Sequence, residues 1–172
     1  MSSYLNTEGF ILAVTYRKAV IQDIDILAPI LREQDKHEVW CSHGVNSREA
    51  LQMSFLNSTE CYSIIEDHLK LVGMFGVVNQ GNGVGMPWML ASDDLPKKEN
   101  VATFLPQGKS WVEGLQKKYQ QLYNYAHAEN HTSLKWLKWL GFDCNEVVQE
   151  WGYHPSTFVR FVWEKEGERL CA

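Results

Sequence analysis

The chain has 172 residues, which suffices for one domain with a buried core and is short for two. It is 45% hydrophobic and 22% charged, which are ordinary globular values that exclude a largely disordered chain. The net charge of -5 disfavours non-specific nucleic-acid binding, so we expect no direct contact with DNA or RNA.

The first third of the chain predicts a strand followed by two helices. Residues 13–19 alternate apolar and polar side chains, which is typical of a strand. Apolar residues then recur at helical spacing over residues 21–31, where Pro29 predicts a kink or a break. Residues 46–49 offer an N-terminal cap to a short helix that ends at about Phe55.

The middle third predicts three antiparallel strands. Residues 61–65 and 69–78 are apolar runs separated by three polar residues, which indicates a hairpin. A glycine-rich turn at 79–85 then leads to a third strand at about 86–91.

The last third alternates helices and strands. After a polar connector at 93–103, we expect a helix that begins near Pro106 and carries an apolar stripe. A strand at 123–128 follows, then a helix that begins at Asn130 and exits through Gly-Phe into another strand. The last strand is expected at 158–163.

These elements predict an α+β fold with a mixed, mostly antiparallel central sheet flanked by helices. We expect a single domain at residues 1–163 and a polar tail at 164–172.

The cysteines and the apolar runs bear on the compartment. Four cysteines without CxxC spacing favour reduced thiols over a disulfide framework; they are Cys41, Cys61, Cys144 and Cys171. The N-terminus lacks the basic and apolar regions of a signal peptide, and no run of about 18 apolar residues predicts a membrane span. We therefore expect a soluble intracellular protein.

Residues 130–142 read Asn-His-Thr-Ser-Leu-Lys-Trp-Leu-Lys-Trp-Leu-Gly-Phe. The stretch resembles the late helix of the GCN5-related N-acetyltransferase (GNAT) family, and the order of elements resembles that family over nearly the whole chain. The resemblance implies a single GNAT-like domain and acetyl-CoA as the cofactor of any activity. It also implies that Asn130 and Ser133 help to hold the pantetheine arm, although Asn130 equally suits a helix cap.

Two parts of the family's catalytic machinery are missing from the sequence. The usual general acid is a tyrosine four residues before the glycine, and that position holds Leu137. The expected central strand at 86–91 has no carboxylate to act as general base. Asp93 and Asp94 follow that strand but are more simply loop or capping residues, and Glu66 with Asp67 falls in a predicted turn.

The family's pyrophosphate loop is also degenerate. Residues 80–85 match its letters, but a strand follows them at once, so we interpret them as a hairpin turn. The loop should lie within residues 92–110, which contain lysines and no Gly-x-Gly. A helix start there could receive an anion, or could be an ordinary helix entrance. The candidate cofactor-binding residues are Leu90, Ser92, Gly108, Lys109, Ser110, Asn130 and Ser133.

Neither a metal site nor a nucleophile is predicted. None of the residues weighed as metal ligands falls at i, i+4 on a helix or in a paired zinc spacing; they are Cys41, His43, His127, His131 and His154. The sequence also has no G-x-S-x-G nucleophile elbow.

The late region is also similar to internal virion protein A, a small GNAT-like protein family of short-tailed podoviruses. The residues that carry this likeness lie at 108–109, 121–125, 130–133, 137–138 and 140–141, with a further match at 81–93. The resemblance implies a phage protein needed for virion morphogenesis, or for building the internal core that serves DNA ejection. That family also tends to lack the catalytic tyrosine and the glycine loop.

The leading hypothesis is therefore an acyltransferase fold used for assembly in the host cell cytoplasm or in the virion, with virion-core or host proteins as partners. The alternatives are an active acetyl-CoA-dependent N-acetyltransferase that modifies a host or phage amine, and a host-directed inhibitor. A binding module would expose a patch of aromatic residues such as Trp40, Trp151 and Trp163.

Overall fold

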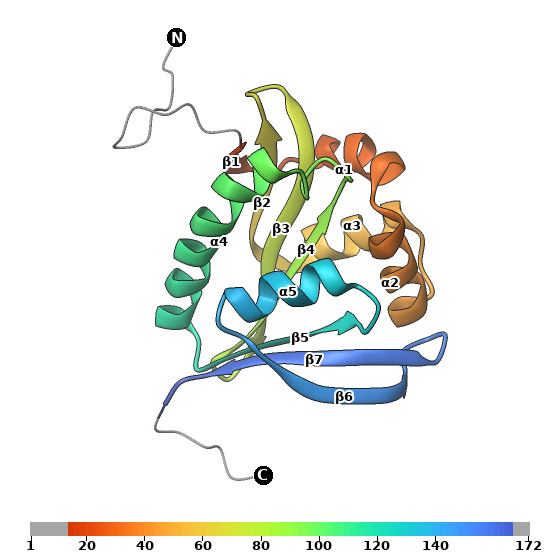
Figure 1. The fold of residues 1–172 in the computed structure, drawn as a ribbon, viewed down its shortest axis with the longest axis vertical. Helices are drawn as coiled ribbons and strands as arrows, with labels where there is room; N and C mark the ends of the chain where they lie inside the picture. The colour runs from red at the N-terminus through yellow and green to blue at the C-terminus, as the bar shows by residue number, and fades with distance from the viewer. Residues whose placement is uncertain (1–13, 167–172) are drawn as a thin grey trace.

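One seven-stranded sheet forms the centre of the computed structural model, which describes residues 14–166 (Figure 1). The strand order is β1-β2-β3-β4-β5-β7-β6. Strands β4 and β5 are parallel, and each other neighbouring pair is antiparallel. The predicted α+β fold with a mixed, mostly antiparallel sheet is confirmed.

The strands are β1 (Val14–Lys18), β2 (Ser58–Glu66), β3 (Lys70–Gly81), β4 (Val84–Ala91), β5 (Gln121–His127), β6 (Asp143–Trp151) and β7 (Ser156–Glu164). The helices are α1 (Gln22–Leu27), α2 (Glu33–His43), α3 (Ser47–Asn57), α4 (Lys98–Lys118) and α5 (His131–Trp139), with a 3-10 turn, η1 (Ala28–Ile30), after α1.

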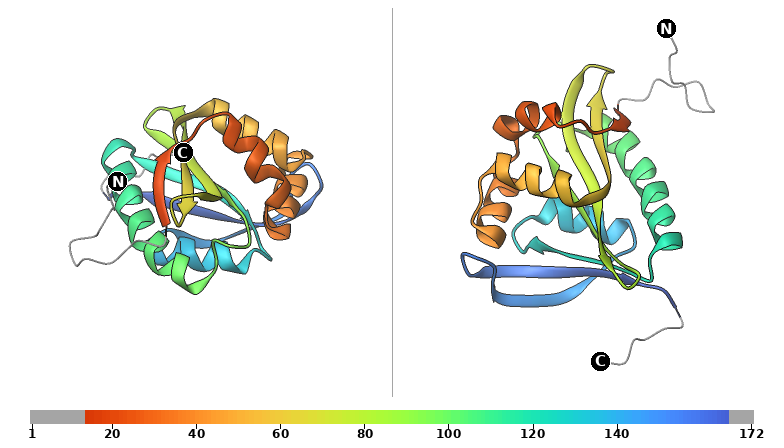
Figure 2. Two further views of the ribbon diagram at one scale, coloured as in Figure 1. Left: turned by 90° about the horizontal axis from the view of Figure 1, so that it is seen from above. Right: turned by 180° about the vertical axis from the view of Figure 1, so that it is seen from behind.

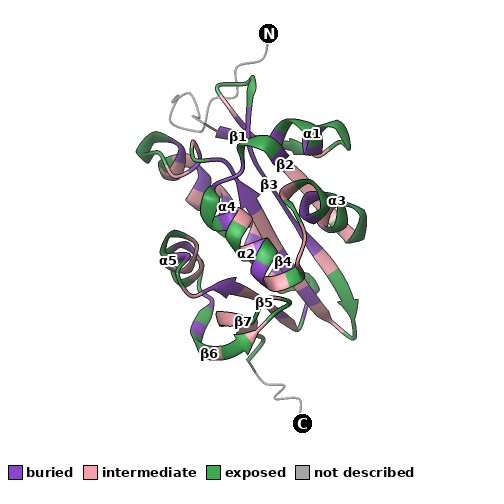
Figure 3. Ribbon diagram, turned by 90° about the vertical axis from the view of Figure 1, so that its right-hand side faces the viewer, coloured by how far each residue is buried: buried purple, intermediate pink, exposed green. Residues whose placement is uncertain are grey.

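Helices cover both faces of the sheet (Figure 2). Helices α1, α2 and α3 pack on one face through a cluster that includes Leu27 and Met74. Helices α4 and α5 lie on the other face, where Phe104 and Trp136 join a cluster with Phe75. Because Met74 and Phe75 are neighbours that enter different clusters, β3 is buried on both sides (Figure 3). This explains why its sequence is a continuous apolar run without alternation.

Tight turns join the central strands as predicted. Asp67 and His68 have positive φ between β2 and β3, and positive φ recurs at Gly81, the last residue of β3, and at Asn82 and Gly83 in the turn that follows. Glycine and asparagine adopt this backbone region at little cost, and two-residue hairpins require it. The interpretation of residues 80–85 as a hairpin turn is confirmed.

The N-terminal helices were predicted only in part. Pro29 ends α1 in the η1 turn, as expected, and α3 begins with a capping box between Asn46 and Glu49. Helix α2 was missed because its buried positions are Asp35, Val39 and Cys41, which form no continuous apolar stripe.

Helix α4 begins at Lys98, eight residues before the predicted start near Pro106, which lies inside the helix. The first turn of α4 was not predicted because its residues are polar and show no apolar stripe. Asn100 is fully buried there, and its amide donates to the Glu66 carboxylate (2.6 Å) and to the Asp94 carbonyl (2.9 Å). These tertiary contacts hold the first turn, where a sequence pattern shows only polar residues.

The predicted boundaries at the two ends of the chain fall close to the limits of the described residues, 14–166. Strand β1 begins at Val14, and residue 13 lies outside the described residues. Strand β7 includes Glu164, and residues 167–172 also lie outside, so the division into domain and tail stays a prediction. Among residues 14–166, no helix is long and apolar enough to cross a membrane.

Candidate functional site

Strands β4 and β5 meet at one end and run apart (Figure 1). They pair only through Val84 with Gln121 and Gly85 with Leu122. One step further along, the Asn124 side chain donates to the Pro87 carbonyl oxygen (3.1 Å) and spans the widening gap. Parallel strands that separate leave backbone groups facing the gap, and those groups need other partners.

A cavity of about 210 Å³ lies in the gap between the strands. Its lining is mainly apolar and includes the aromatic side chains of Trp88 from β4, Trp111 from α4, Tyr125 from β5 and Trp136 from α5. The indole Nε1 of Trp111 is buried and has no hydrogen-bond partner among the described residues. The cavity is smaller than the roughly 300–1,000 Å³ of typical small-molecule sites.

The end of β4 beyond this cavity is closed by the start of α2. Asp35 accepts a hydrogen bond from the Ala91 N–H (2.9 Å), and the Arg32 N–H donates to the Ala91 carbonyl (2.9 Å). Arg32 and Asp35 also form a buried ion pair (2.5 Å). Leu31 and Ser92 continue the contact as a β-bridge. The edge that faces the gap at Ala91 is therefore satisfied from within the protein.

The start of α5 joins this polar cluster through Asn130 and Ser133. The Asn130 side-chain oxygen Oδ1 accepts from the Ser133 N–H (3.4 Å) as the α5 cap, and its side-chain amide donates to Glu38 (3.1 Å) and to Asp35 (3.4 Å). Arg32 donates to the Ser133 hydroxyl (3.2 Å). We call Arg32, Asp35, Glu38, Asn130 and Ser133 the polar cluster.

Within the polar cluster, Glu38 has a carboxyl group with a raised pKa. Burial raises its pKa to about 7, and the negative charge of Asp35 adds to the rise. Hydrogen bonds from the His127 N–H (2.8 Å) and from Asn130 oppose that rise. Glu38 also lines the cavity.

Comparison with protein-family models gave no match, and comparison with curated proteins gave none either. Solved structures did match. A GCN5-related N-acetyltransferase from Kribbella flavida superposes with a TM-score of 0.65 at 12% identity, covering 89% of this chain and 98% of that chain. This chain has the GNAT fold.

Two further GNAT-fold enzymes give similar values. Spermidine N-acetyltransferase from Vibrio cholerae, in complex with CoA and spermine, has a TM-score of 0.64 at 12% identity, over 88% of this chain and 95% of that chain. The ribosomal-protein-S5-alanine acetyltransferase of Vibrio fischeri has a TM-score of 0.65 at 12% identity, over 90% and 94%. At such identities the likeness concerns the fold alone.

The residues predicted to bind a cofactor are dispersed over the GNAT fold. Leu90, Gly108 and Ser133 line the cavity, and Asn130 lies behind it in the polar cluster. Ser92 is buried and donates to the Val72 carbonyl (3.2 Å).

The anion-binding argument for Gly108, Lys109 and Ser110 was wrong in its premise. These residues lie in the middle of α4, where backbone N–H groups bond within the helix. The Lys109 ammonium sits over the Trp139 ring (5.4 Å), and the Ser110 hydroxyl donates to the Pro106 carbonyl (3.3 Å). Whether any of the three contacts a ligand stays a prediction.

The actual start of α4 carries charges of both signs. Asp94 precedes it and forms ion pairs with Lys70 (2.5 Å) and with Lys97. Hydrogen bonds from Lys70 and then Lys97 hold the pKa of Asp94 below its usual value. A bound pyrophosphate would meet this carboxylate, and both Lys70 and Lys97 are already paired with it.

The position of the missing general acid is apolar. Leu137 lines the cavity and packs against the cluster that contains Phe142 and Phe161. Tyr16 also lines the cavity, but its hydroxyl donates to the Phe104 carbonyl (3.0 Å), and burial raises its pKa further above the usual value. Neither side chain is suited to give up a proton near neutral pH.

Arg32, Asp35 and Glu38 were missed because α2 was missed. One signal was present in the sequence, since Asp35 and Glu38 stand one turn apart next to Val39, which a helix would bury together. The partners Ala91 and Asn130 are far away in the chain, and no local pattern could have paired them with α2.

We predict that Glu38 makes the protein less stable as the pH rises from about 4.5 through 7. A carboxyl whose folded pKa is raised binds its proton more tightly in the folded state, so folding loses free energy over that window. Glu38→Gln should remove this loss, a few kcal/mol in size, and be more stable than the wild type at pH 8. Urea unfolding at pH 5 to 8 measures the difference.

Glu33→Gln is the matched control, because Glu33 lies on the same helix with its side chain 82% exposed. A Glu38→Gln protein that tracks the wild type at every pH would show that Glu38 titrates normally.

Proposed function

We propose that this chain is a GNAT-fold phage protein that acts in virion morphogenesis, in building the internal core that serves DNA ejection, with acetyltransferase chemistry absent or degenerate. The resemblance to internal virion protein A supports the phage role. The closed end of β4 supports the loss of chemistry and is the observation that carries it. The protein would act in the host cell cytoplasm or in the virion, on virion-core or host proteins.

The closure at Ala91 bears directly on a cofactor. A ligand arm that runs along β4 would need the backbone groups that Asp35 and Arg32 already hold at 2.9 Å. Freeing them would leave Arg32 and Asp35 buried without these partners, at a cost of about 1–3 kcal/mol for each unsatisfied group. Asn130 and Ser133 would have to leave the same polar cluster to reach that arm.

The surface offers an aromatic patch for a protein partner, but a different one from that predicted. Trp40 at the end of α2 is 50% exposed and Tyr153 in the β6–β7 turn is 69% exposed, with the His154 ring stacked on Trp40 at 4.4 Å. Trp151 instead stacks on Tyr125 inside the fold at 4.4 Å. We call Trp40, Tyr153 and His154 the aromatic patch.

Trp163 was also expected on that patch. It is half-buried against the core cluster of α4, β5 and β7 and so does not belong to it.

We predict that Trp40→Ala abolishes assembly and leaves the melting temperature nearly unchanged. Trp151→Ala should destabilise the fold by about 2–4 kcal/mol, because its ring contacts Tyr125 and Phe158. The measurement is the plating efficiency of a phage that lacks this gene and is complemented by each variant. Full complementation by a folded Trp40→Ala protein would contradict a role for the patch.

The second candidate function is an acetyl-CoA-dependent N-acetyltransferase that modifies a host or phage amine. The cavity between β4 and β5 favours it, because it lies between the strands where this fold would place a reacting group. Loss of a catalytic acid typically costs about 10²–10⁴-fold, which leaves room for slow turnover.

Calorimetric titration with acetyl-CoA and with CoA separates the two functions. We predict no binding at millimolar ligand, because the end of β4 is closed and the Asp94 carboxylate precedes the start of α4, where it already pairs with Lys70 and Lys97. Lys109→Ala and Asn130→Ala, checked for folding by circular dichroism, serve as controls. Micromolar binding by the wild type that both variants lose would support the acetyltransferase and justify a screen of amine acceptors.

A further inference from the structure

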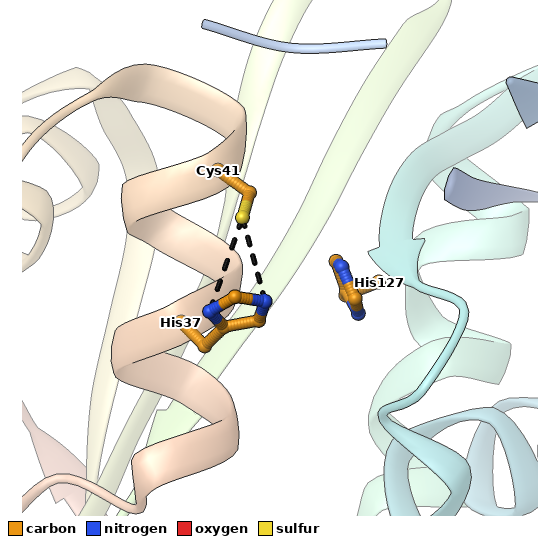
Figure 4. A group of neighbouring side chains, drawn as sticks. All are labelled: His37, Cys41 and His127. Atoms are coloured by element: carbon orange, nitrogen blue, oxygen red, sulfur yellow. Dashed lines mark hydrogen bonds between the residues drawn. The ribbon is translucent and has the colours of Figure 1, made fainter. Parts of the chain in front are cut away.

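Three side chains with metal-binding atoms meet between α2 and the end of β5 (Figure 4). His37 and Cys41 project from one side of α2, and His127 faces them as the last residue of β5. One ligand atom from each lies within 4.8 Å of the other two. We propose that His37, Cys41 and His127 bind a zinc ion that ties α2 to β5.

The spacing on the helix is that of a metal site. Residues at i and i+4 lie one above the other on the same helix face, so His37 and Cys41 reach the same point in space. Cys41 and His43, the pair considered from the sequence, are two residues apart and do not share a helix face, whereas His37 and Cys41 do. The third residue, His127, comes from a distant strand and could be found only from the fold.

The distance between Cys41 and His37 matches that of a filled site, and His127 lies within 4.8 Å of both. Zinc binds thiolate sulfur at about 2.3 Å and imidazole nitrogen at about 2.0–2.1 Å, so tetrahedral geometry places sulfur and nitrogen roughly 3.5–3.6 Å apart. The Cys41 Sγ lies 3.5 Å from the His37 Nε2. Small rotations of the side chains of His127 and His37 would bring the third ligand to bonding distance.

His127 is held as metal-bound histidines usually are. Its Nε2 is 2.7 Å from the Ser156 hydroxyl, and its Nδ1 accepts a long hydrogen bond from the Glu129 N–H (3.3 Å). With the proton on Nε2 and donated to Ser156, Nδ1 carries the lone pair. Binding zinc through Nδ1 would give up only the long contact, while Ser156 would keep the ring oriented.

The surroundings hold Cys41 in place. The turn between β6 and β7 packs on the end of α2, where the His154 N–H donates to the Cys41 carbonyl (2.9 Å) and the Tyr153 N–H donates to the Ser42 carbonyl (3.1 Å). Cys41 and His127 are buried, and His37 is exposed. The site is therefore built on two secondary-structure elements and opens to solvent beside His37.

The donor set points to zinc among the common ions. One thiolate and two imidazoles suit a borderline-soft cation and exclude Mg²⁺ and Ca²⁺, which take oxygen ligands. Three protein ligands leave a fourth position for water, as in open zinc sites.

Metal-free protein titrated with Co²⁺, followed by competition with Zn²⁺, tests the proposal. We expect one equivalent of Co²⁺ to produce a thiolate-to-metal charge-transfer band, Zn²⁺ to displace it, and the melting temperature to rise with Zn²⁺. Cys41→Ser should remove the band. His37→Gln should weaken binding more than about 100-fold, and Ser156→Ala by about 10–100-fold.

One cysteine and one histidine outside the proposed site provide matched control variants. Cys61→Ser on β2 and His43→Gln on α2 should bind as the wild type does. His37 is exposed, so His37→Gln should fold even if the buried variants do not, and circular dichroism without metal checks each protein. The absence of a charge-transfer band at one equivalent, or a band that survives in Cys41→Ser and vanishes in Cys61→Ser, would overturn the proposal.

Discussion

The separation of β4 from β5 is the constraint on which the rest of this structure depends. The two strands are parallel and pair through two residue pairs, after which the backbone edge of β4 faces a widening gap. An unpaired backbone group buried away from water costs about as much as a lost hydrogen bond, so the edge must find partners. In this chain the partners are the Asn124 side chain at Pro87 and the start of α2 at Ala91.

The hydrogen bonds between Ala91 and the start of α2 determine which polar residues are buried there. Asp35 must be buried to accept from the Ala91 N–H, and Arg32 supplies the opposite charge within 2.5 Å. The N-cap residue of α5 contacts the same buried group, because Asn130 donates to Asp35 and Glu38. This chain thus uses the cleft between β4 and β5 for internal hydrogen bonds at one end and keeps an apolar cavity of about 210 Å³ at the other.

The sequence predicted those parts of the fold that depend on local signals. The capping box at Asn46 and the glycine turn at residues 80–85 are local, and both were confirmed. The start of α4 and the whole of α2 were not, since they depend on tertiary contacts such as Asn100 with Glu66 and Asp35 with Ala91. The family resemblance predicted the fold and identified Leu137 as the position of the missing general acid. Local periodicity alone could not have assigned that role to position 137.

The candidate site was predicted less well for the same reason. Asn130 and Ser133 were weighed as ligand-binding residues, with a helix cap as the equal alternative for Asn130. The structure shows that cap and places both residues in contacts within the protein. Leu90 and Gly108 reach the cavity, while Lys109 and Ser110 lie along α4 outside its lining. Residues that meet across the fold, such as Glu38 with His127, have no signal in one sequence without their partners.

The exchange rate of the Ala91 amide proton, measured by nuclear magnetic resonance without ligand, tests the central claim most directly. If Asp35 closes the cleft, that proton should exchange as slowly as the buried amides of β3 and should be unaffected by acetyl-CoA. Fast exchange in the free protein, followed by protection when acetyl-CoA is added, would show that the edge of β4 is open and that a cofactor completes it.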